Sequence, residues 1–566
     1  MPTTSSVRWI AGLAVAALGT IPLGAQARTA GYHTAARLAA VLDSVARAKP
    51  GVVTVSTIAT SPGGRPVHLV RIGADDDQPA LLVLAGAYGP QVASSEVALR
   101  LIRELAGRAG TADGRGAART VYVVPRLNPD AAEAFFAPVR AERRGNDGKD
   151  DDDRDGALDE DAPDDLNGDG LITMMRVKVE AGGEWMVDPV DPALMRRADA
   201  TKGERGTHRL FVEGKDDDGD EAYNEDGPGG TDLALNFAHN YTFFAPGAGQ
   251  HAFSAPESRA IAELVTARLN IAAVYVLGMQ DNLVKPWEGR TVPGIGGNPQ
   301  GTSAGGPLSA TLPADNAWFA EIAKRAPRPV VGQDPVSAAE SGDPLSWSYF
   351  HMGRFAFGSR VWWPGKAPAD TAAGRRAPTP DPLAAERNDY RWLKANDPAG
   401  FVEWKAVPGF TIDGKPVEVG GMAPGAALNP AASTLDSLGR KQADWVVDLV
   451  KLLPSVALTG PAKVEAVGPR TWRISAEVTN GGYLPTNAAI GVRSRLPRRV
   501  KVEIALGAGQ SLAGGRKVQY IDALRGSGSV QRFEWLVVGD AGATVTLTVG
   551  APNAGSATET ITLRAR

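Results

Sequence analysis

The alternation of short apolar runs with amphipathic segments constrains the fold of this chain more than any other feature. Residues 52–58, 67–72 and 80–85 are apolar runs of strand length, and residues 95–105 follow with helical spacing. The pattern continues with apolar runs at 121–124, 271–277 and 354–363 and helical spacing at 34–45, 256–269 and 436–453. Strands that alternate with helices bury their apolar faces in layers. We therefore predict an α/β domain with a parallel or mixed sheet flanked by helices.

A change of pattern after Pro454 predicts a second domain. The chain there has short alternating strands rich in Val and Thr with Gly and Asn turns, as in residues 472–482. This pattern is typical of a β-sandwich of the immunoglobulin-like type. The predicted organisation is a signal peptide at 1–27, an α/β domain at 28–454 and a β-sandwich at 455–566. A chain of 566 residues, 43% hydrophobic and 22% charged, is long enough for these soluble globular units.

The N-terminus has the features of a secretory signal. Arg8 supplies a positive charge, residues 10–18 form a short apolar core, and Ala25-Gln26-Ala27 is a small-x-small cleavage site. The alternative, an N-terminal core helix, fits less well because the apolar run is short. We expect a periplasmic or extracellular protein with no transmembrane segment after signal removal. The chain has no cysteine, which excludes disulfides and thiolate metal sites.

Charge is distributed unevenly along the chain. The formal net charge is −4, but residues 147–169 carry −10 and residues 213–226 carry −7, so the remainder carries +13. Like charges this concentrated repel one another unless water or cations neutralise them. We interpret the two runs as acidic insertions at 146–176 and 213–227 in the α/β domain. The positive charge is spread over the remainder and not striped along one element, so a nucleic-acid partner is not expected.

Three repeats within these insertions have the spacing of calcium-binding loops. In the pattern D-x-[DN]-x-[DN]-G, oxygens at alternate positions converge on a hard cation and glycine permits the sharp turn. The residues at ligand positions are Asp151, Asp153, Asp155, Asp159, Asp165, Asn167, Asp169, Asp216, Asp218 and Asp220. No repeat has the glutamate at the twelfth position of an EF-hand, so neighbouring loops would have to supply ligands. We expect calcium as a cofactor, and the alternative is a solvated acidic loop.

Five segments in the α/β domain resemble motifs of the zinc carboxypeptidase family in the family's order. They are Ser61-Pro-Gly-Gly-Arg-Pro66, Pro125-Arg-Leu-Asn-Pro-Asp130, Gly230-Thr-Asp-Leu-Ala-Leu-Asn-Phe237, Ala255-Pro-Glu257 and Ser346-Trp-Ser-Tyr349. Each segment alone is a weak signal, but five at plausible spacing across residues 32–453 indicate the fold. The resemblance implies a carboxypeptidase-like mixed sheet followed by the C-terminal β-sandwich.

The resemblance also shows which catalytic positions are substituted. Members of the family bind zinc through an H-x-x-E pair and a second histidine, and a glutamate activates the zinc-bound water. Here Tyr88 and Gln91 stand at the H-x-x-E pair, Gly278 at the second histidine and Arg360 at the general base. The phenol of tyrosine and the amide of glutamine are not normal zinc ligands, and glycine has no side chain that could bind zinc. The guanidinium of arginine cannot accept a proton at neutral pH. Zinc is therefore not expected, although the family uses it.

The positions that would bind the substrate differ as well. Ala234 and Leu235 replace the family's N-R pair, which grips the carboxylate of a peptide. Arg143 lies at the spacing of the family's oxyanion-stabilising arginine and is a candidate for that role. Tyr88 and Gln91 could be ordinary strand-end residues or repurposed binding residues. For Arg360 the simpler alternative is a salt bridge to a nearby acid.

Three functional hypotheses follow from these residues. The first is a non-catalytic binding protein that holds a peptide or a cell-wall fragment. The second is an active metallocarboxypeptidase or amidase with a non-standard site. The retained scaffold and Arg143 support it. The third assigns the main function to the β-sandwich as an adhesion or docking module.

Overall fold

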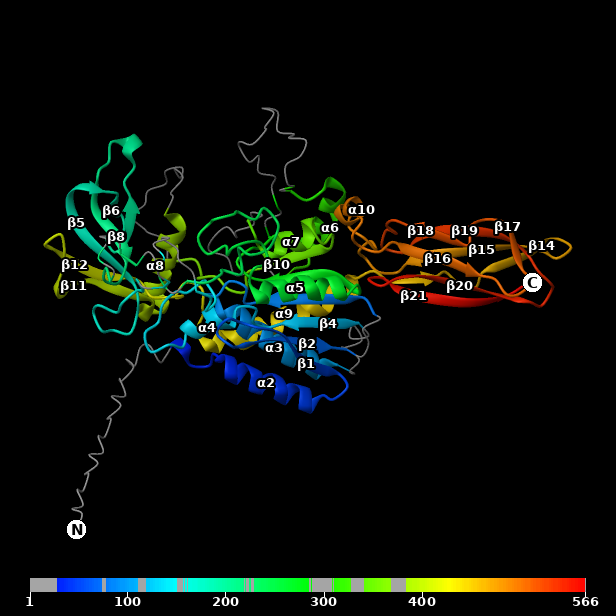
Figure 1. Cartoon of the computed structure of the whole chain (residues 1–566), viewed down its shortest axis with the longest axis horizontal. Coiled ribbons are helices and arrows are strands. Elements are labelled where there is room, and N and C mark those ends of the chain that lie inside the picture. Colours follow the sequence, from blue (N-terminus) through cyan, green and yellow to red (C-terminus); the bar gives the residue numbers. More distant parts are fainter. Residues whose placement is uncertain are drawn as a thin grey trace, which may run out of the picture.

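The computed structural model describes residues 28–564 apart from 74–77, 110–118, 150–155, 157, 160, 218, 220–222, 225, 226, 228, 285, 286, 288–307, 309, 327–340 and 368–382. The predicted signal peptide, 1–27, lies outside the described residues. Three bodies follow one another along the long axis of the molecule: a lobe with a small sheet, a central α/β domain and a β-sandwich (Figure 1). None of the helices within the described ranges is both long and apolar enough to cross a membrane.

The central domain is built on a six-stranded mixed sheet. Its strands, in spatial order, are β1 (Val53–Thr60), β2 (Pro66–Ile72), β4 (Thr120–Val124), β3 (Ala80–Ala85), β9 (Ile271–Leu277) and β10 (Phe355–Ser359). β1, β2 and β4 pair antiparallel, whereas β4, β3, β9 and β10 pair parallel. Every residue of β3 and β9 is buried, as expected for parallel strands covered on both faces.

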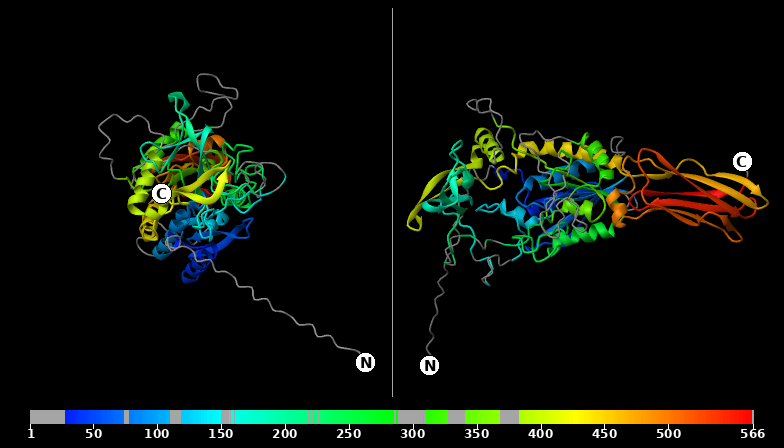
Figure 2. Two further views of the ribbon diagram at one scale, coloured as in Figure 1. Left: turned by 90° about the vertical axis from the view of Figure 1, so that its left-hand side faces the viewer. Right: turned by 90° about the horizontal axis from the view of Figure 1, so that it is seen from above.

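Helices cover both faces of this sheet. They are α2 (Ala35–Ala48), α3 (Val92–Arg108), α4 (Pro129–Ala134), α5 (Pro256–Ala267), α6 (Pro313–Ala323), α7 (Pro344–Phe350) and α9 (Ala432–Leu452). Helix α8 (Ala384–Asn396) packs instead against residues 398–412. Helix α2 begins where the Thr34 hydroxyl accepts the backbone N–H of Arg37. Helices α3 and α9 pack against each other, and α9 and α5 lie on opposite sides of the sheet (Figure 2, right). The predicted mixed sheet flanked by helices is therefore confirmed.

A second six-stranded sheet forms a lobe that the sequence analysis did not predict. Its spatial order is β11 (Phe401–Ile412), β12 (Lys415–Met422), β5 (Met174–Gly183), β8 (Gly206–Val212), β6 (Trp185–Val187) and β7 (Met195–Arg197), all antiparallel. A small separate core lies on one face, with buried Met175, Val177, Ile412, Val417 and Val419. Part of the predicted acidic insertion at 146–176 therefore leads into a folded strand.

Two local patterns in the sequence indicate parts of this lobe. Apolar Met175, Val177 and Val179 alternate with Arg176 and Lys178, which is the period of a half-buried strand. Asp413 and Gly414 join β11 to β12 with φ values of 52° and 71°, the two positive values of a type I′ hairpin turn. These signals predict the hairpin and the strand separately. They do not predict that segments more than 200 residues apart pair with each other.

The C-terminal domain is a sandwich of two antiparallel sheets. One sheet contains β13 (Val456–Leu458), β14 (Lys463–Gly468), β15 (Thr471–Asn480), β17 (Ser511–Gly514) and β19 (Ser529–Val538); the other contains β16 (Val500–Ala505), β18 (Val518–Ile521), β20 (Thr544–Ala551) and β21 (Gly555–Thr562). A core of its own, with fully buried Trp535, lies between the sheets. The predicted C-terminal β-sandwich is confirmed.

The sandwich is joined to the α/β domain by an apolar and hydrogen-bonded contact. Leu484, Ala488 and Ile490 belong to the sandwich half of the chain but pack into the core of the α/β domain. Helix α10 (Ala489–Ser494) begins there, and the Asp315 carboxylate of α6 accepts the N–H groups of Ala489 at 2.8 Å and Ile490 at 3.2 Å. A side chain of one domain thus satisfies the first turn of a helix in the other.

Candidate functional site

The residues that the sequence analysis matched to the catalytic positions of the family lie near one edge of the central sheet. In the register of the parallel strands, Leu277 is aligned with both Ala85 of β3 and Ser359 of β10. Gly278 and Arg360 therefore come directly after aligned strand ends, and Gly278 N–H donates to the Ser359 carbonyl at 3.2 Å. Tyr88 and Gln91 lie between β3 and α3 at the same edge. Ligands of open α/β sheets bind at the carboxyl ends of the strands, and this is that edge.

Tyr88 is paired with an arginine. Its hydroxyl accepts hydrogen bonds from Arg144 Nε at 3.3 Å and Nη2 at 3.2 Å, and the Arg144 guanidinium lies 4.9 Å from the centre of the Tyr88 ring. Burial raises the pKa of the Tyr88 phenol, so the phenol is protonated at neutral pH. A neutral phenol beside a guanidinium offers no ligand to zinc.

Gln91 is a buried amide at the start of α3. It is 0% exposed, and neither its oxygen nor its nitrogen has a hydrogen-bond partner among the described residues. The Ser95 hydroxyl, one turn further along α3, also has none there. Such buried polar groups are uncommon in folded proteins because each costs about 1–3 kcal/mol when it is left without a partner.

Arg360, which the sequence analysis matched to the general base of the family, is a buried cation. It is 7% exposed, and its guanidinium stacks on Trp363 at 3.7 Å from the ring centre. Arg360 Nε donates to the Trp362 carbonyl at 3.1 Å and Nη2 to the Ala427 carbonyl at 3.3 Å. Burial lowers the pKa of Arg360 to about 10, so it is charged at neutral pH. In the described part of the chain these hydrogen bonds go to carbonyl oxygens and not to the carboxylate of a salt bridge.

The clamp positions carry no charge that could grip a carboxylate. Ala234 N–H donates to Asp232 Oδ1 at 2.9 Å, and Leu235 N–H donates to the Asp232 carbonyl at 2.9 Å. The Leu235 carbonyl is so close to Gly342 that a Cβ atom there would lie 1.9 Å away. Both positions therefore belong to a tight turn packed against a neighbouring loop.

Two adjacent arginines have different environments. Arg143 donates to the Asn146 carbonyl at 2.7 Å and pairs with Asp147 at 2.6 Å. The side chain of Arg144 is 59% exposed and reaches Tyr88. Sequence spacing selected Arg143 as the oxyanion candidate, and that role stays a prediction. Spacing could not separate the two neighbours, so it missed Arg144.

Sequence reasoning also missed Asp281, which follows β9 by four residues. Asp281 is 1% exposed, and its Oδ1 accepts the N–H groups of Leu283 at 3.2 Å and Val284 at 2.9 Å. Burial raises the pKa of this carboxyl group, and hydrogen bonds, one of them from Ser359, oppose the shift. Its place in the polar run 280–282 directly after a buried strand was the available signal.

The retained family motifs form a hydrogen-bond frame beside this edge. Asp130 accepts the Ser61 hydroxyl at 2.6 Å, the Gly63 N–H at 3.0 Å, the Asp147 N–H at 3.0 Å and Arg65 Nη1 at 2.7 Å. Burial raises the pKa of Asp130, but these hydrogen bonds outweigh it and hold the pKa below its usual value. The first two motifs therefore meet on a single carboxylate.

Asn146 and Glu257 extend the frame to the third and fourth motifs. Asn146 Nδ2 donates to both Glu257 oxygens, at 3.0 and 3.1 Å, and Asn146 Oδ1 accepts the Thr231 N–H at 3.0 Å. Asn236 Oδ1 accepts the Ser258 hydroxyl at 2.6 Å. Motif residues that build backbone structure are thus retained, whereas those expected to handle zinc and substrate are substituted.

The structure brings the two acidic insertions together. Leu166 N–H donates to Glu213 Oε1 at 3.0 Å, and Asp217 N–H donates to Asp161 Oδ1 at 3.0 Å. Glu213 is fully buried, and burial raises its pKa with a contribution from Asp169. The described parts of the two acidic runs are therefore in contact.

Only some of the predicted calcium ligands fall within the described residues. Asp159, Asp165, Asn167, Asp169 and Asp216 are described, whereas Asp151, Asp153, Asp155, Asp218 and Asp220 lie outside them. The Asp165 carboxylate accepts the N–H groups of Gly168, Asp169 and Gly170 at 2.7–3.1 Å. Among the described residues no group of three or more His, Asp or Glu side chains is placed to hold a metal ion.

The mixed α/β domain and these motifs are similar to those of zinc carboxypeptidases. Residues 38–165 match the zinc carboxypeptidase family, and residues 459–562 match a domain of unknown function (DUF8731). The resemblance predicted from the motifs is thereby confirmed, and the carboxypeptidase-like fold class with it. No curated protein matches the chain.

Several solved structures are similar to this chain. Bovine thrombin-activatable fibrinolysis inhibitor, in complex with tick carboxypeptidase inhibitor, is 11% identical, with 74% of this chain and 97% of that chain covered and a TM-score of 0.38. Carboxypeptidase A from Helicoverpa armigera is 16% identical, with coverage of 65% and 73% and a TM-score of 0.35. A metallo-carboxypeptidase from Burkholderia cenocepacia is 25% identical over 18% of this chain and 28% of that chain, with a TM-score of 0.17.

Proposed function

We propose that this protein is a non-catalytic binding protein of the carboxypeptidase fold, which holds a peptide or a cell-wall fragment at the carboxyl edge of its central sheet. The observation that carries the proposal is the position of Arg360. A buried guanidinium at the end of β10 would repel zinc and cannot activate water, but it attracts an anion strongly in a poorly hydrated site.

The neighbours of Arg360 support an anionic ligand group. Arg144 adds a second guanidinium on the Tyr88 side of the edge. Burial lowers the pKa of Arg360, and the nearby Asp389 and Tyr88 oppose that shift. The free carboxylate of a peptide or of a cell-wall stem has the charge and planar shape that arginine recognises in a bidentate way. The ligand would then be bound through its terminal carboxylate, next to the peptide bond that a carboxypeptidase cleaves, and this bond would not be hydrolysed.

Two further parts of the proposal concern the acidic region and the location of the protein. Calcium bound between the two insertions would offset their combined charge, and ligand-spaced Asp165, Asn167 and Asp169 would contribute oxygens. The signal-like residues 1–27 favour a periplasmic or extracellular protein, in which calcium is accessible.

A matched pair of variants tests the binding site. Arg354 and Arg360 lie immediately before and after β10, and both are buried, with 5% and 7% exposed. The probe is a labelled cell-wall pentapeptide with a free carboxylate, compared with its amidated form. We expect the full chain to bind the free acid about tenfold more tightly. Arg360→Gln should abolish this preference, and Arg354→Gln, at the opposite edge, should retain it.

The same preparation distinguishes the proposal from the alternative of an active metallocarboxypeptidase or amidase. Metal analysis should find zinc well below one equivalent, and incubation with peptides should release no C-terminal residue. Stoichiometric zinc together with hydrolysis that a chelator stops would instead establish the enzyme. Equal binding of both peptide forms would contradict the assigned role of Arg360.

A further inference from the structure

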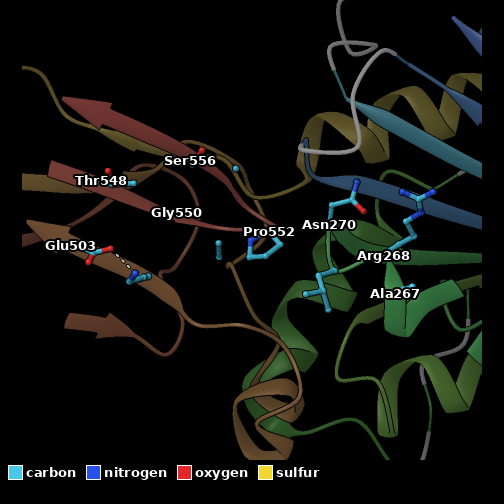
Figure 3. Close-up of a pocket in the computed structure, with 12 residues that line it drawn as sticks. Ala267, Arg268, Asn270, Glu503, Thr548, Gly550, Pro552 and Ser556 are labelled. Carbon is cyan, nitrogen blue, oxygen red and sulfur yellow. Dashed lines mark hydrogen bonds and ion pairs between the residues drawn. The ribbon is translucent and has the colours of Figure 1, made fainter. Parts of the chain in front are cut away.

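A groove lies between the α/β domain and the β-sandwich, away from the strand-end site. Its first part, of about 540 Å³, has residues 267–270 at the end of α5 on one wall and residues of β16, β20 and the start of β21 on the other. Arg268 and Asn270 lie opposite Glu503, Thr548 and Ser556 across this space (Figure 3).

A second cavity continues the groove along the sandwich. It has a volume of about 910 Å³ and is lined by the loop after α10, by β16 and by Tyr520 and Asp522. The two parts share Lys501, Gly550 and Pro552, so they form one continuous concave surface. This surface is the outer face of the second sheet, since Lys501 is exposed while its neighbours Val500 and Val502 are buried in the sandwich.

The groove has an excess of positive charge. Its lining contains five basic residues, Arg268, Arg495, Arg498, Arg499 and Lys501, and two acidic residues, Glu503 and Asp522. Lys501 pairs with Glu503 at 2.5 Å and Arg499 with Asp522 at 3.5 Å. Arg495 and Arg498 make no ion pair with any described residue. Residues 493–501 hold five bases and no acid, so positive charge is locally concentrated here and not spread out as the sequence analysis assumed.

The basic loop is held in place by the surrounding structure. Asn487 is buried, with 6% of its surface exposed. Its Nδ2 donates to the carbonyls of Arg498 at 3.2 Å and Asp522 at 2.8 Å. Arg499 stacks on Tyr520 with its guanidinium 4.4 Å from the ring centre. Because the backbone is fixed, little ordering of the loop would be needed when a ligand binds.

We propose that this groove binds an acidic polysaccharide through the carboxylate or phosphate groups of the polysaccharide. A single anion would leave most of the space unfilled, whereas a polymer strand could run along both parts. A bilayer surface is flat and does not fit a concave groove. Binding of single-stranded nucleic acid on such surfaces relies on aromatic side chains that stack with bases, and Tyr520, the one aromatic residue among the described lining residues, is already covered by Arg499. Duplex DNA binds through its phosphates and is therefore one of the probes in the test.

The test measures binding of the full chain to four probes and to dextran. The probes are polygalacturonate, a phosphorylated mannan, duplex DNA and vesicles of phosphatidylglycerol with phosphatidylcholine. We expect binding to one or both acidic polysaccharides and none to neutral dextran. The affinity should fall about tenfold between 50 and 200 mM salt, because release of counterions drives such binding. Binding only to DNA or only to vesicles would overturn the proposal, as would no binding at all.

Charge reversal at matched positions locates the site. Arg498→Glu with Arg499→Glu should weaken polysaccharide binding at least tenfold. The control, Arg473→Glu with Arg532→Glu, changes the net charge equally on the other sheet of the sandwich, where both arginines are exposed and paired with glutamates, and should change the affinity less than twofold. Equal loss in both variants would mean that net charge and not the groove determines binding. If the first variant unfolds, Arg495→Gln with Arg498→Gln provides the same comparison with a smaller change.

Discussion

Replacing Glu257 with glutamine should change how the stability of the α/β domain depends on pH. Glu257 is fully buried at the start of α5, where both its oxygens accept hydrogen bonds from Asn146. Burial raises the pKa of Glu257 from 4.5 to about 7, and the nearby charges of Asp130 and Asp147 contribute. The folded protein therefore binds this proton more tightly than the unfolded chain does.

The sign and size of the effect follow from linkage. Because the folded pKa is raised, the stabilisation by the protonated form is complete below pH 4.5 and is lost as the pH rises toward and through 7. A shift of this size corresponds to about 3 kcal/mol at full ionisation, of which about 2–3 kcal/mol falls between pH 5 and pH 8.5. Glu257→Gln keeps the shape and an acceptor for Asn146 but cannot ionise. The stability of the variant relative to the native chain should therefore increase by that amount over this range.

Urea unfolding followed by tryptophan fluorescence at pH 5 and pH 8.5 measures this difference. A difference in the free energy of unfolding that is the same at both pH values would reflect the new amide and not the lost ionisation. The quantity to compare is therefore how this difference changes with pH. Glu263→Gln, on the exposed side of the same helix, is the control and should have the same effect at both pH values. A difference for Glu257→Gln that does not vary with pH, or that decreases toward pH 8.5, would refute the reasoning.

Two other predictions concern the domain contact and the acidic region. Asp315→Ala removes the acceptor of two α10 N–H groups and of the Tyr349 hydroxyl at 2.8 Å, and should lower the free energy of unfolding by about 2–4 kcal/mol in urea titrations. Asp315→Asn, which retains an acceptor, should cost clearly less, and equal costs would contradict the capping role. Calcium should raise the thermal midpoint and a chelator should lower it by linkage. Asp169→Ala should remove a larger part of that shift than Asp448→Ala on the surface of α9, and melting that is the same with calcium and with chelator would rule out a stabilising calcium site.

Local patterns in the sequence predicted much of the central domain. The apolar runs at 80–85 and 271–277 became the fully buried parallel strands β3 and β9, because a strand covered on both faces needs apolar residues at every position. Since parallel strands end at one edge of the sheet, the positions that follow β3, β9 and β10 necessarily lie close together. Tyr88, Gln91, Gly278 and Arg360 follow these strands, and their match to the catalytic positions of the family stays a prediction.

Other features depend on contacts that no local pattern contains. β5 and β12 pair across more than 200 residues, and Arg143 and Arg144 differ only in what surrounds them. The groove of basic residues exists because α10 docks on Asp315 and brings the loop after it beside β16. Backbone periodicity and turn chemistry act over a few residues, and a sequence therefore specifies its elements locally. Which elements meet is decided by packing and hydrogen bonding in the whole fold, where each contact depends on many distant residues at once.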